Sequence, residues 1–311
     1  MSSRVRRLAL VGNHLPRRCG IATFTTHLSE AIGACAPDVS RLVIPVDDRP
    51  EGYDYPDPVR FVLQQNELES YREAADFLNI NRVDAVVLQH EFGIFGGVAG
   101  AHVLTLVDDL RMPRITALHT VPSEPTPDQR AVLTRLADAS DVLVVLAEEA
   151  VRLLDDVYGV PRARVRVIPH GIPDVPFTDP AFHKDRFGVE GKVVLLTLGL
   201  LGPGKGIEYA IDALPAVIER FPDVVYIVLG ATHPNVVRHE GERYRLSLQQ
   251  RARERGVDAH VIFLNRFVTE EELVECIGAA DIYLTPYLNP DQIVSGTLAY
   301  SVGAGKAVVS T

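Results

Sequence analysis

The stretch Val193-Val-Leu-Leu-Thr-Leu-Gly-Leu-Leu-Gly-Pro-Gly-Lys-Gly-Ile207 contains the pattern that decides the fold. It begins with an almost wholly apolar run, which is typical of a strand buried on both faces of a sheet. A glycine-rich turn follows, and a segment with the apolar spacing of a helix begins at Ile207. This order predicts one unit of a doubly wound parallel sheet, with the turn at the carboxyl end of its strand.

The turn has the chemistry of an anion site. Glycines leave backbone N–H groups exposed, and Lys205 adds a positive charge beside them, so a phosphate or diphosphate is the expected ligand. The turn is not a Walker A loop, because Gly206 stands where Ser or Thr is needed, and its glycines do not follow the G-x-G-x-x-G spacing. The alternative is an ordinary strand-to-helix turn with a solvated lysine.

Short apolar runs alternate with helical segments along all 311 residues, a length that suits two domains. A loop rich in Pro, Asp and Phe at 171–182 predicts the boundary. The expected fold class is α/β, with Rossmann-like doubly wound parallel-sheet domains over residues 1–180 and 181–311 that face a cleft. Strands are expected at Leu8–Val11, Arg41–Val46, Ala85–Gln89, Arg114–Leu118, Val142–Leu146, Val165–Ile168, Val193–Leu198, Val224–Leu229, His260–Leu264, Ile282–Leu284 and Ala307–Ser310.

Composition excludes several classes of protein. The 31 Lys and Arg against 41 Asp and Glu give a net charge of −10, which argues against nucleic acid or an anionic membrane as the main partner. No apolar run is long enough to span a membrane, so a cytoplasmic protein is expected, with a peripheral membrane contact left open. Three cysteines, no H-x-x-x-H spacing and no D-x-D triplet predict neither a disulfide framework nor a metal site.

A second turn, Gly12–Ile21, follows the first expected strand and leads into a helix. Its exit offers N–H donors, while Arg17 and Arg18 offer positive charge. Cys19 near the helix start suits either a nucleophile of lowered pKa or, as the simpler interpretation, a small residue lining a tight turn.

Three histidines follow expected strands of the first domain: His90, His119 and His170. Residues just past the carboxyl ends of parallel strands collect at one sheet edge, so these histidines, with Glu91, are expected to line a cleft. A single histidine at such a place is more often a loop residue that bonds to backbone.

Near the end of the sequence, a polar loop leads from a strand at Tyr283 into a helix. Ser295, Gly296 and Thr297 supply hydroxyls and N–H donors at that helix start, and Asp291 and Gln292 suit sugar hydroxyls. Ordinary capping and turn chemistry is the alternative.

Seven segments in order resemble the retaining family 4 glycosyltransferases of GT-B fold, in particular the mannosyltransferase-like branch. They are Pro16–Phe24, Gln89–Gly97, His119–Thr120, Ile168–Gly171, Gly204–Gly206, Ala231–Pro234 and Ser295–Tyr300. The family's later strands and final helix would follow the strand at Ala307–Ser310, so the resemblance implies an incomplete second domain.

The resemblance implies a role for each matching residue. Gly20 lets the donor phosphate approach the backbone, His119 contacts the transferred sugar, and Lys205 neutralises the donor diphosphate. Asn265 and Phe267 lie in the loop that grips the nucleotide base. Gly204 belongs to the donor turn, and Arg17 or Arg18 adds charge.

The sequence departs from the family at three positions. Leu200 stands where many relatives carry Arg, and Gln292 and Tyr300 stand where the family has paired glutamates. Gln292 keeps the ability to bind a hexose, whereas donor binding through Tyr300 would pass to Ser295, Gly296 and Thr297.

The function that the resemblance implies is retaining, metal-independent transfer of a hexose, mannose favoured, from a nucleotide sugar to a carbohydrate or glycoconjugate acceptor. The donor favoured is GDP-mannose, with UDP- and ADP-sugars left open, and no cofactor is required. The acceptor hydroxyl would attack from the front face, assisted by the departing phosphate. A binding module without turnover, and an epimerase or phosphorylase of the same fold, are the alternatives.

Overall fold

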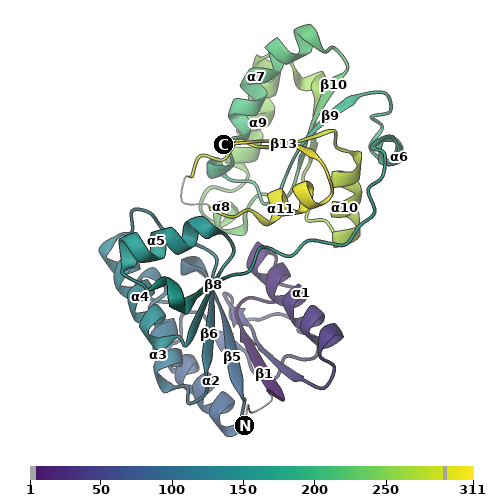
Figure 1. Cartoon of the computed structure of the whole chain (residues 1–311). Helices are drawn as coiled ribbons and strands as arrows, with labels where there is room; N and C mark the ends of the chain where they lie inside the picture. Colours follow the sequence, from purple (N-terminus) through teal and green to yellow (C-terminus); the bar gives the residue numbers. More distant parts are fainter. Residues whose placement is uncertain (1–4, 290–292) are drawn as a thin grey trace. The chain divides into compact units, whose positions relative to one another are not determined.

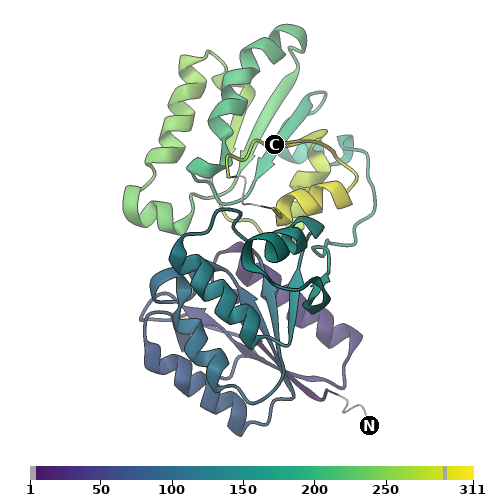
Figure 2. The ribbon, with the colours of Figure 1, turned by 60° about the vertical axis from the view of Figure 1, so that its left-hand side comes forward.

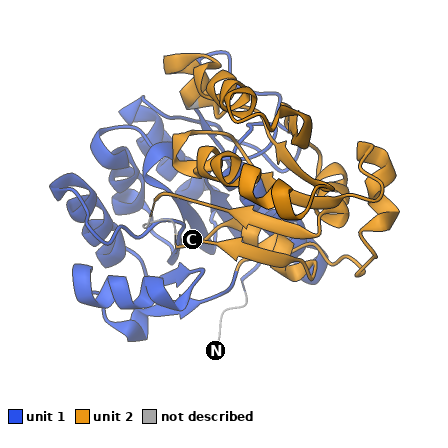
Figure 3. Cartoon of the chain, turned by 90° about the horizontal axis from the view of Figure 1, so that it is seen from above, with its two compact units in different colours: residues 1–169 blue, residues 170–311 orange. Residues whose placement is uncertain are grey.

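The computed structural model describes residues 5–289 and 293–311 and divides the chain into two compact units. Unit 1 comprises residues 1–169 and unit 2 residues 170–311, coloured separately in Figure 3. The division falls inside the Ile168-Pro-His-Gly171 segment, somewhat before the predicted boundary at 180/181. His170 therefore begins unit 2 and does not end unit 1.

Unit 1 is built on a sheet of six parallel strands in the order β2-β1-β5-β6-β7-β8. Its centre is apolar because β1 and β5 are covered on both faces, and Leu10 and Leu88 are almost completely buried. The strands are β1 (Arg7–Val11), β2 (Ser40–Ile44), β5 (Ala85–His90), β6 (Arg114–Leu118), β7 (Val142–Val145) and β8 (Val165–Val167), and a separate pair is formed by β3 (Val46–Asp47) and β4 (Leu63–Gln64).

The helices of unit 1 lie on both faces of this sheet. In Figure 1, α1 is on one side of the strands and α2, α3 and α4 are on the other. This arrangement follows from right-handed crossover connections. From β1 to β2 the chain moves toward one edge of the sheet, and from β5 to β8 it moves toward the other edge, so the connecting helices lie on opposite faces. The helices are α1 (Gly20–Cys35), α2 (Leu68–Ile80), α3 (His102–Asp109), α4 (Pro127–Ala139) and α5 (Glu148–Tyr158), with short 3₁₀ turns η1 (Phe92–Ile94), η2 (Val98–Gly100) and η3 (Arg162–Arg164).

Two expected elements of unit 1 are interrupted for visible reasons. The expected strand Arg41–Val46 is broken at Pro45, which has no N–H to donate, so that β3 pairs with β4 instead. The sequence also predicts a helix over Val98–Asp109, but the helix begins only at His102, since Ala99 and Gly100 adopt positive φ angles of 51° and 78°.

Unit 2 has five parallel strands in the order β11-β10-β9-β12-β13. Strand β9 occupies the middle position, which places the glycine turn after it between its two neighbours. The strands are β9 (Val193–Leu198), β10 (Val224–Leu229), β11 (Val261–Leu264), β12 (Ile282–Thr285) and β13 (Ala307–Ser310).

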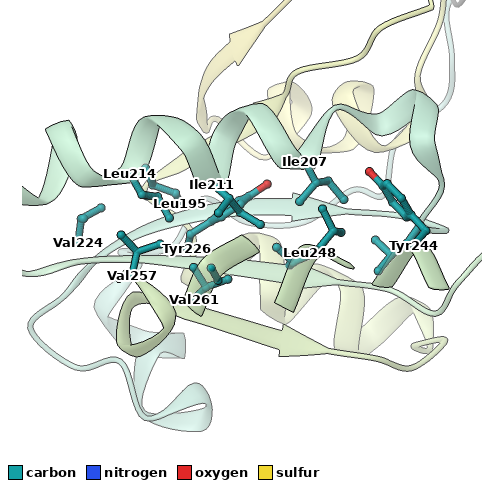
Figure 4. Close-up of a cluster of buried hydrophobic side chains, with 13 residues drawn as sticks. Leu195, Ile207, Ile211, Leu214, Val224, Tyr226, Tyr244, Leu248, Val257 and Val261 are labelled. Carbon is teal, nitrogen blue, oxygen red and sulfur yellow. The ribbon is translucent and has the colours of Figure 1, made fainter. Parts of the chain in front are cut away.

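Helices also cover both faces of the unit 2 sheet, as the turned view in Figure 2 and the labels of Figure 1 show. On one face, Ile211 of α7 and Leu248 of α9 pack with Tyr226 of β10 in a buried cluster (Figure 4). On the other face, Cys276 and Ile277 of α10 pack against the opposite side of the strands. The helices are α6 (Ala181–Lys184), α7 (Ile207–Arg220), α8 (Pro234–Glu240), α9 (Arg243–Glu254), α10 (Glu270–Ala279) and α11 (Gly296–Gly303), with 3₁₀ turns η4 (Asp185–Phe187), η5 (Pro203–Lys205) and η6 (Asp258–His260). The patterns in the sequence do not predict α6, α8 or β4.

Local sequence sets where several helices begin and end. The Thr126 hydroxyl accepts from the N–H of Gln129 at the start of α4, and the Gln129 side chain returns the bond, which forms a capping box. Thr269 and Glu272 do the same for α10. Gly159, with φ 68°, ends α5 in the left-handed conformation that favours glycine.

The core of unit 1 gives a first stability prediction. Leu88→Ala removes a 1% exposed side chain from the central strand β5, and we expect it to lower the free energy of unfolding by about 2–5 kcal/mol. The control Ile80→Ala, at a side chain 78% exposed, should change it by less than about 0.5 kcal/mol. Urea unfolding measures both, and equal losses would contradict this account of the core.

Candidate functional site

The glycine turn of unit 2 docks tightly on the segment that follows β12. Gly206 has φ 63°, and a Cβ there would overlap the carbonyl oxygen of Pro286. The N–H of Leu288 donates to the Gly204 oxygen at 3.0 Å, which closes the contact from the other side. Only glycine fits at 206, so the turn after β9 and the loop after β12 are held together.

This contact gathers hydroxyl groups around Lys205. The Lys205 Nζ lies 4.0 Å from the ring centroid of Tyr287. The Tyr287 hydroxyl is 3.3 Å from Thr297 Oγ1, and Ser295 Oγ is 3.0 Å from the same atom. Tyr283 donates to Thr297 Oγ1 at 2.8 Å. We call Lys205, Tyr283, Tyr287, Ser295 and Thr297 the hydroxyl cluster.

The electrostatics of the hydroxyl cluster favour negative charge. Burial raises the pKa of Tyr287, but the Lys205 ammonium and hydrogen bonds from Ser295 and Thr297 outweigh it, so the pKa is lowered overall. Ser295 also caps α11, because its Oγ accepts from the N–H of Leu298 at 3.3 Å. An ammonium group, several hydroxyls and a helix N-terminus in one place can bind a phosphate or diphosphate.

Gly296 and His170 lie beside the hydroxyl cluster. The His170 and Tyr300 rings are 5.7 Å apart in an edge-on arrangement, and a Cβ on Gly296 would come within 2.9 Å of His170 Nε2. His170 was expected at the sheet edge of the first domain. It packs instead against the start of α11, because the chain has already crossed into unit 2.

The remaining donor residues of unit 2 are dispersed. Leu200 is half-buried just after β9, and its neighbour Leu201 forms a bridge to Thr232. Asn265 and Arg266 line a pocket of about 370 Å³ with residues of β11, η4 and α10, and Phe267 is 37% exposed. None of the pocket's lining residues comes from the glycine turn. Gln292 and Asp291 lie outside the described residues.

In unit 1, the first turn forms the start of α1. Gly20 is its first residue, exposed, with nothing within 4 Å of the place where a Cβ would stand. Cys19 is the N-cap, whose Sγ accepts from Ala22 N at 3.3 Å and from Asn13 Nδ2 at 3.2 Å. The structure thus gives Cys19 a capping role, the simpler of the two interpretations.

Arg17 is directed into unit 1 itself. Its guanidinium donates to the Val46 oxygen at 2.7 Å and lies 3.5 Å from the Asp48 carboxylate. Its side chain is only 11% exposed. This differs from the expected donor contact because an acidic partner in the neighbouring loop engages the charge.

The two residues that end β5 point to opposite faces of the sheet. Gln89 is fully buried, and its Oε1 lies 2.8 Å from His119 Nε2 at the end of β6. His90 is also fully buried, but it stacks on Phe95 and meets Phe92 edge-on. Those two aromatic rings explain why His90 does not line a cleft as expected.

Burial sets the charge of the acid and the base in this region. Desolvation, with a smaller contribution from His119, lowers the pKa of His90 to about 3. Burial raises the pKa of the half-buried Glu91 despite hydrogen bonds from Thr120 Oγ1, at 2.5 Å, and from Phe92 N. His90 is therefore neutral near pH 7.

Sequence reasoning missed three side chains of these sites: Gln89, Tyr283 and Tyr287. Gln89 directly precedes His90. Successive side chains of a strand point to opposite faces, so either residue of this polar pair at the end of β5 is a candidate for a functional site. The tyrosines lie in and just after the strand expected at Ile282–Leu284, but spacing alone did not show that Tyr287 meets Lys205 or that Tyr283 meets Thr297. Among residues 5–289 and 293–311, no group of three or more His, Cys, Asp or Glu is placed to hold a metal ion.

Family models match both units of the chain. The model described as Glycosyltransferase Family 4 matches residues 19–174, half of the chain. The chain belongs to glycosyltransferase family 4. A second model, Glycosyl transferases group 1, matches residues 179–291 of this family 4 chain.

Curated relatives of this family 4 chain come from mycobacteria. It is 29% identical over 172 residues to a GDP-mannose-dependent alpha-(1-6)-phosphatidylinositol monomannoside mannosyltransferase of Mycolicibacterium smegmatis, covering 54% of this chain and 42% of the relative. It is 31% identical over 144 residues to a phosphatidyl-myo-inositol mannosyltransferase of Mycobacterium tuberculosis, covering 46% and 34%. The match thus spans less than half of each of these relatives.

Solved structures share the fold of the family 4 chain. Anabaena Alr3699/HepE in complex with UDP-glucose aligns with a TM-score of 0.73 at 16% identity, over 97% of this chain and 80% of that one. The lipopolysaccharide glycosyltransferase WaaG aligns with a TM-score of 0.66, over 97% and 80%, also at 16% identity. These likenesses confirm the expected GT-B class, an α/β fold with parallel sheets.

The glycine turn of the family 4 chain yields a matched pair of variants. Gly206→Ala forces a Cβ onto the Pro286 carbonyl at a left-handed φ, and we expect it to cost at least about 1–2 kcal/mol of unfolding free energy. Gly204→Ala, where a Cβ meets nothing within 4 Å, should cost less than about 0.5 kcal/mol. Urea unfolding compares them, and a harmless Gly206→Ala would disprove the tight docking.

Because His90 is buried, we expect the free energy of unfolding to depend on pH. Its folded pKa of about 3 lies below its ordinary 6.5, so the unfolded chain binds more protons and stability rises with pH between these values. His90→Phe should flatten this rise by up to about 1.4 kcal/mol per pH unit. The exposed His239→Gln serves as control. Urea unfolding at a series of pH values tests this, and an unchanged slope in His90→Phe would refute it.

Proposed function

We propose that this family 4 chain catalyses retaining, metal-independent transfer of a hexose from a nucleotide sugar to a carbohydrate or glycoconjugate acceptor. The observation that carries the proposal is the hydroxyl cluster, where Lys205 meets Ser295 and Thr297 at the start of α11. Mannose and a GDP-linked donor are favoured, because the M. smegmatis relative is described as a GDP-mannose-dependent mannosyltransferase. UDP- and ADP-linked donors remain alternatives, and HepE has been solved with UDP-glucose.

The proposed reaction requires the protein to stabilise negative charge and to position the donor and the acceptor. As the bond from the sugar to the donor phosphate breaks, negative charge grows on the leaving diphosphate. In this proposal, that charge would be stabilised by the Lys205 ammonium and by the hydroxyls and N–H groups of Ser295, Gly296 and Thr297. The acceptor hydroxyl then attacks from the face that the diphosphate leaves, with a phosphate oxygen taking its proton.

Other residues have proposed roles in the same reaction. Gly20 at the α1 start leaves open space for a phosphate, and His119 is proposed to contact the transferred sugar. The donor site would be completed by Leu200, Gly204, Asn265 and Phe267, and the resemblance adds Gln292. Arg17 is not proposed there, because its guanidinium is bound to Val46 and Asp48. Glu91 is proposed for the acceptor side. His90, which is enclosed by Phe92 and Phe95, and His170, which lies beside the hydroxyl cluster, are not proposed there. No cofactor is proposed.

A binding protein without turnover is the second candidate. It is favoured by Tyr300, which takes the place of the family's second glutamate and packs against His170. A tyrosine hydroxyl binds a ribose less strongly than a carboxylate does, because its hydrogen bond is not charge-assisted. Measuring turnover directly separates this candidate from an enzyme.

Lys205→Ala tests the diphosphate site. We expect it to weaken binding of GDP, UDP or ADP, whichever binds best to the unmodified protein, by at least about tenfold, or about 1.4 kcal/mol. The control Lys192→Ala removes an exposed lysine paired with Asp223 in the same unit, and should leave affinity unchanged. Calorimetry with the three nucleotides gives the affinities.

Turnover is measured as free nucleotide released from GDP-mannose, UDP-glucose and ADP-glucose with a carbohydrate acceptor present. Release that falls with Lys205→Ala but not with Lys192→Ala supports transfer. Tight binding without release would favour the binding protein, and equal release from both variants would overturn the proposed role of Lys205.

A further inference from the structure

The contact between Lys205 and Tyr287 differs from the contacts of the other lysines. The sequence contains four lysines, and all of them lie in unit 2. Lys184 and Lys192 each pair with an aspartate, at 2.8 and 3.1 Å, and Lys306 donates to a backbone carbonyl oxygen at 2.8 Å. The Lys205 Nζ instead lies 4.0 Å from the centroid of the Tyr287 ring.

An aromatic ring restrains an ammonium group in a different way from a carboxylate. A carboxylate fixes the ammonium and also neutralises its charge, so that it competes with any anion that approaches. The face of a phenol ring attracts a cation through its π electrons and carries no net charge. The long side chain of Lys205 is thus restrained over the ring while its positive charge stays available to an anion.

The backbone around Tyr287 is fixed from three directions. The carbonyl group before it packs on Gly206, where a side chain would not fit. The N–H of Leu288, just after it, donates to the Gly204 oxygen at 3.0 Å. The carbonyl oxygen of Tyr287 itself accepts from Thr311 Oγ1 at 2.7 Å. The ring therefore extends from a backbone that cannot move without breaking these contacts.

The phenol hydroxyl orients the ring, while the ring face is the closer match to the ammonium. Tyr287 Oη lies 3.3 Å from Thr297 Oγ1 and 3.4 Å from Ser295 Oγ, which are long distances for hydrogen bonds between hydroxyls. A hydrogen bond with Lys205 is one of the causes that lower the pKa of Tyr287. The 4.0 Å from Nζ to the ring centroid is well within the range of cation–π attraction, so we expect the ring to provide most of the restraint.

We propose that Tyr287 is a positioning residue that holds the Lys205 ammonium over its ring in the free protein and keeps it there when a diphosphate binds. An ammonium group has three N–H donors, and those that point away from the ring remain available to phosphate oxygens. Because the lysine is restrained beforehand, less of its rotamer freedom is lost on binding. That the diphosphate belongs to a sugar donor rests on the proposed function, whereas the positioning applies to any diphosphate.

The position of the ammonium is tested by NMR of the full chain labelled with carbon-13 at lysine. Lys205→Arg removes one of four sets of signals and so identifies it. Protons above the face of an aromatic ring are shielded, so the Lys205 Hε signals should lie further upfield in the unmodified protein and in Tyr287→Phe than in Tyr287→Leu. They should stay upfield after inorganic pyrophosphate is added. Signals that match those of Tyr287→Leu in the unmodified protein, with or without pyrophosphate, would overturn the proposal.

Calorimetry with inorganic pyrophosphate tests what the positioning does. Tyr287→Leu should weaken binding about three- to tenfold, and Tyr287→Phe, which keeps the ring, less than about twofold. The matched control is Tyr209→Leu, which removes a tyrosine ring 58% exposed on α7 of the same unit and should leave the affinity unchanged. Equal losses in Tyr287→Leu and Tyr287→Phe, no loss in Tyr287→Leu, or no binding to the unmodified protein would each contradict the proposal. Should Tyr287→Leu fail to fold, as urea unfolding would show, Tyr287→Phe and the NMR of the unmodified protein still decide.

Release of free nucleotide separates this role from the proposed function. Tyr287→Leu should lower kcat/KM for the nucleotide sugar at least about threefold, Tyr287→Phe should recover most of it, and Tyr209→Leu should match the unmodified protein. An unchanged kcat/KM in Tyr287→Leu would argue against positioning. If no nucleotide sugar is turned over but the NMR and pyrophosphate results hold, the proposed function fails and the role of Tyr287 stands.

Discussion

The close approach of the Gly206 backbone to the Pro286 carbonyl is the constraint on which the unit 2 site depends. The glycine turn after β9 and the loop after β12 belong to adjacent strands, and a side chain at 206 would separate them. With glycine there, Lys205 lies over Tyr287, and Tyr287 in turn meets the hydroxyls that begin α11. The positive charge of the site thus comes from Lys205. The position of that lysine depends on Gly206, which has no side chain.

In unit 1 too, a glycine after a strand allows a close approach between two segments, but the groups around it are different. Gly12 follows β1, and a Cβ there would come within 2.8 Å of the Gln89 Cβ, so the absence of a side chain leaves room for this polar residue of β5. The groups that meet there are the Gln89 amide, the His119 imidazole and the Phe24 ring, in contrast to the cationic cluster of unit 2. The edge of unit 1 thus presents uncharged polar groups, whereas the cluster of unit 2 presents a positive charge.

Sequence patterns predicted the fold more fully than the sites, for physical reasons. Buried parallel strands such as Val193–Leu198 are apolar throughout, so their positions were predicted directly, and the glycine turn predicted the position of Lys205 at a strand end. The partners of Lys205 were not predicted, because Tyr287 reaches it only through a crossover connection. Likewise, alternation along β5 implies that Gln89 and His90 face opposite sides, but Phe92 and Phe95 decide which one is enclosed by rings. Arg17 pairs with Asp48 because β3 and the loop after it bring the two residues together. Their separation in the sequence does not reveal this pairing.

The position of Lys205 over Tyr287 has a practical consequence. The chain contains ten tyrosines and no tryptophan, so tyrosine alone dominates its near-ultraviolet absorption and emission. A phenol ring in direct contact with an ammonium group responds to any anion that draws that ammonium away. Tyr287 is one of ten tyrosines that contribute to this signal, and with no tryptophan in the sequence a change at its ring is not masked by indole emission.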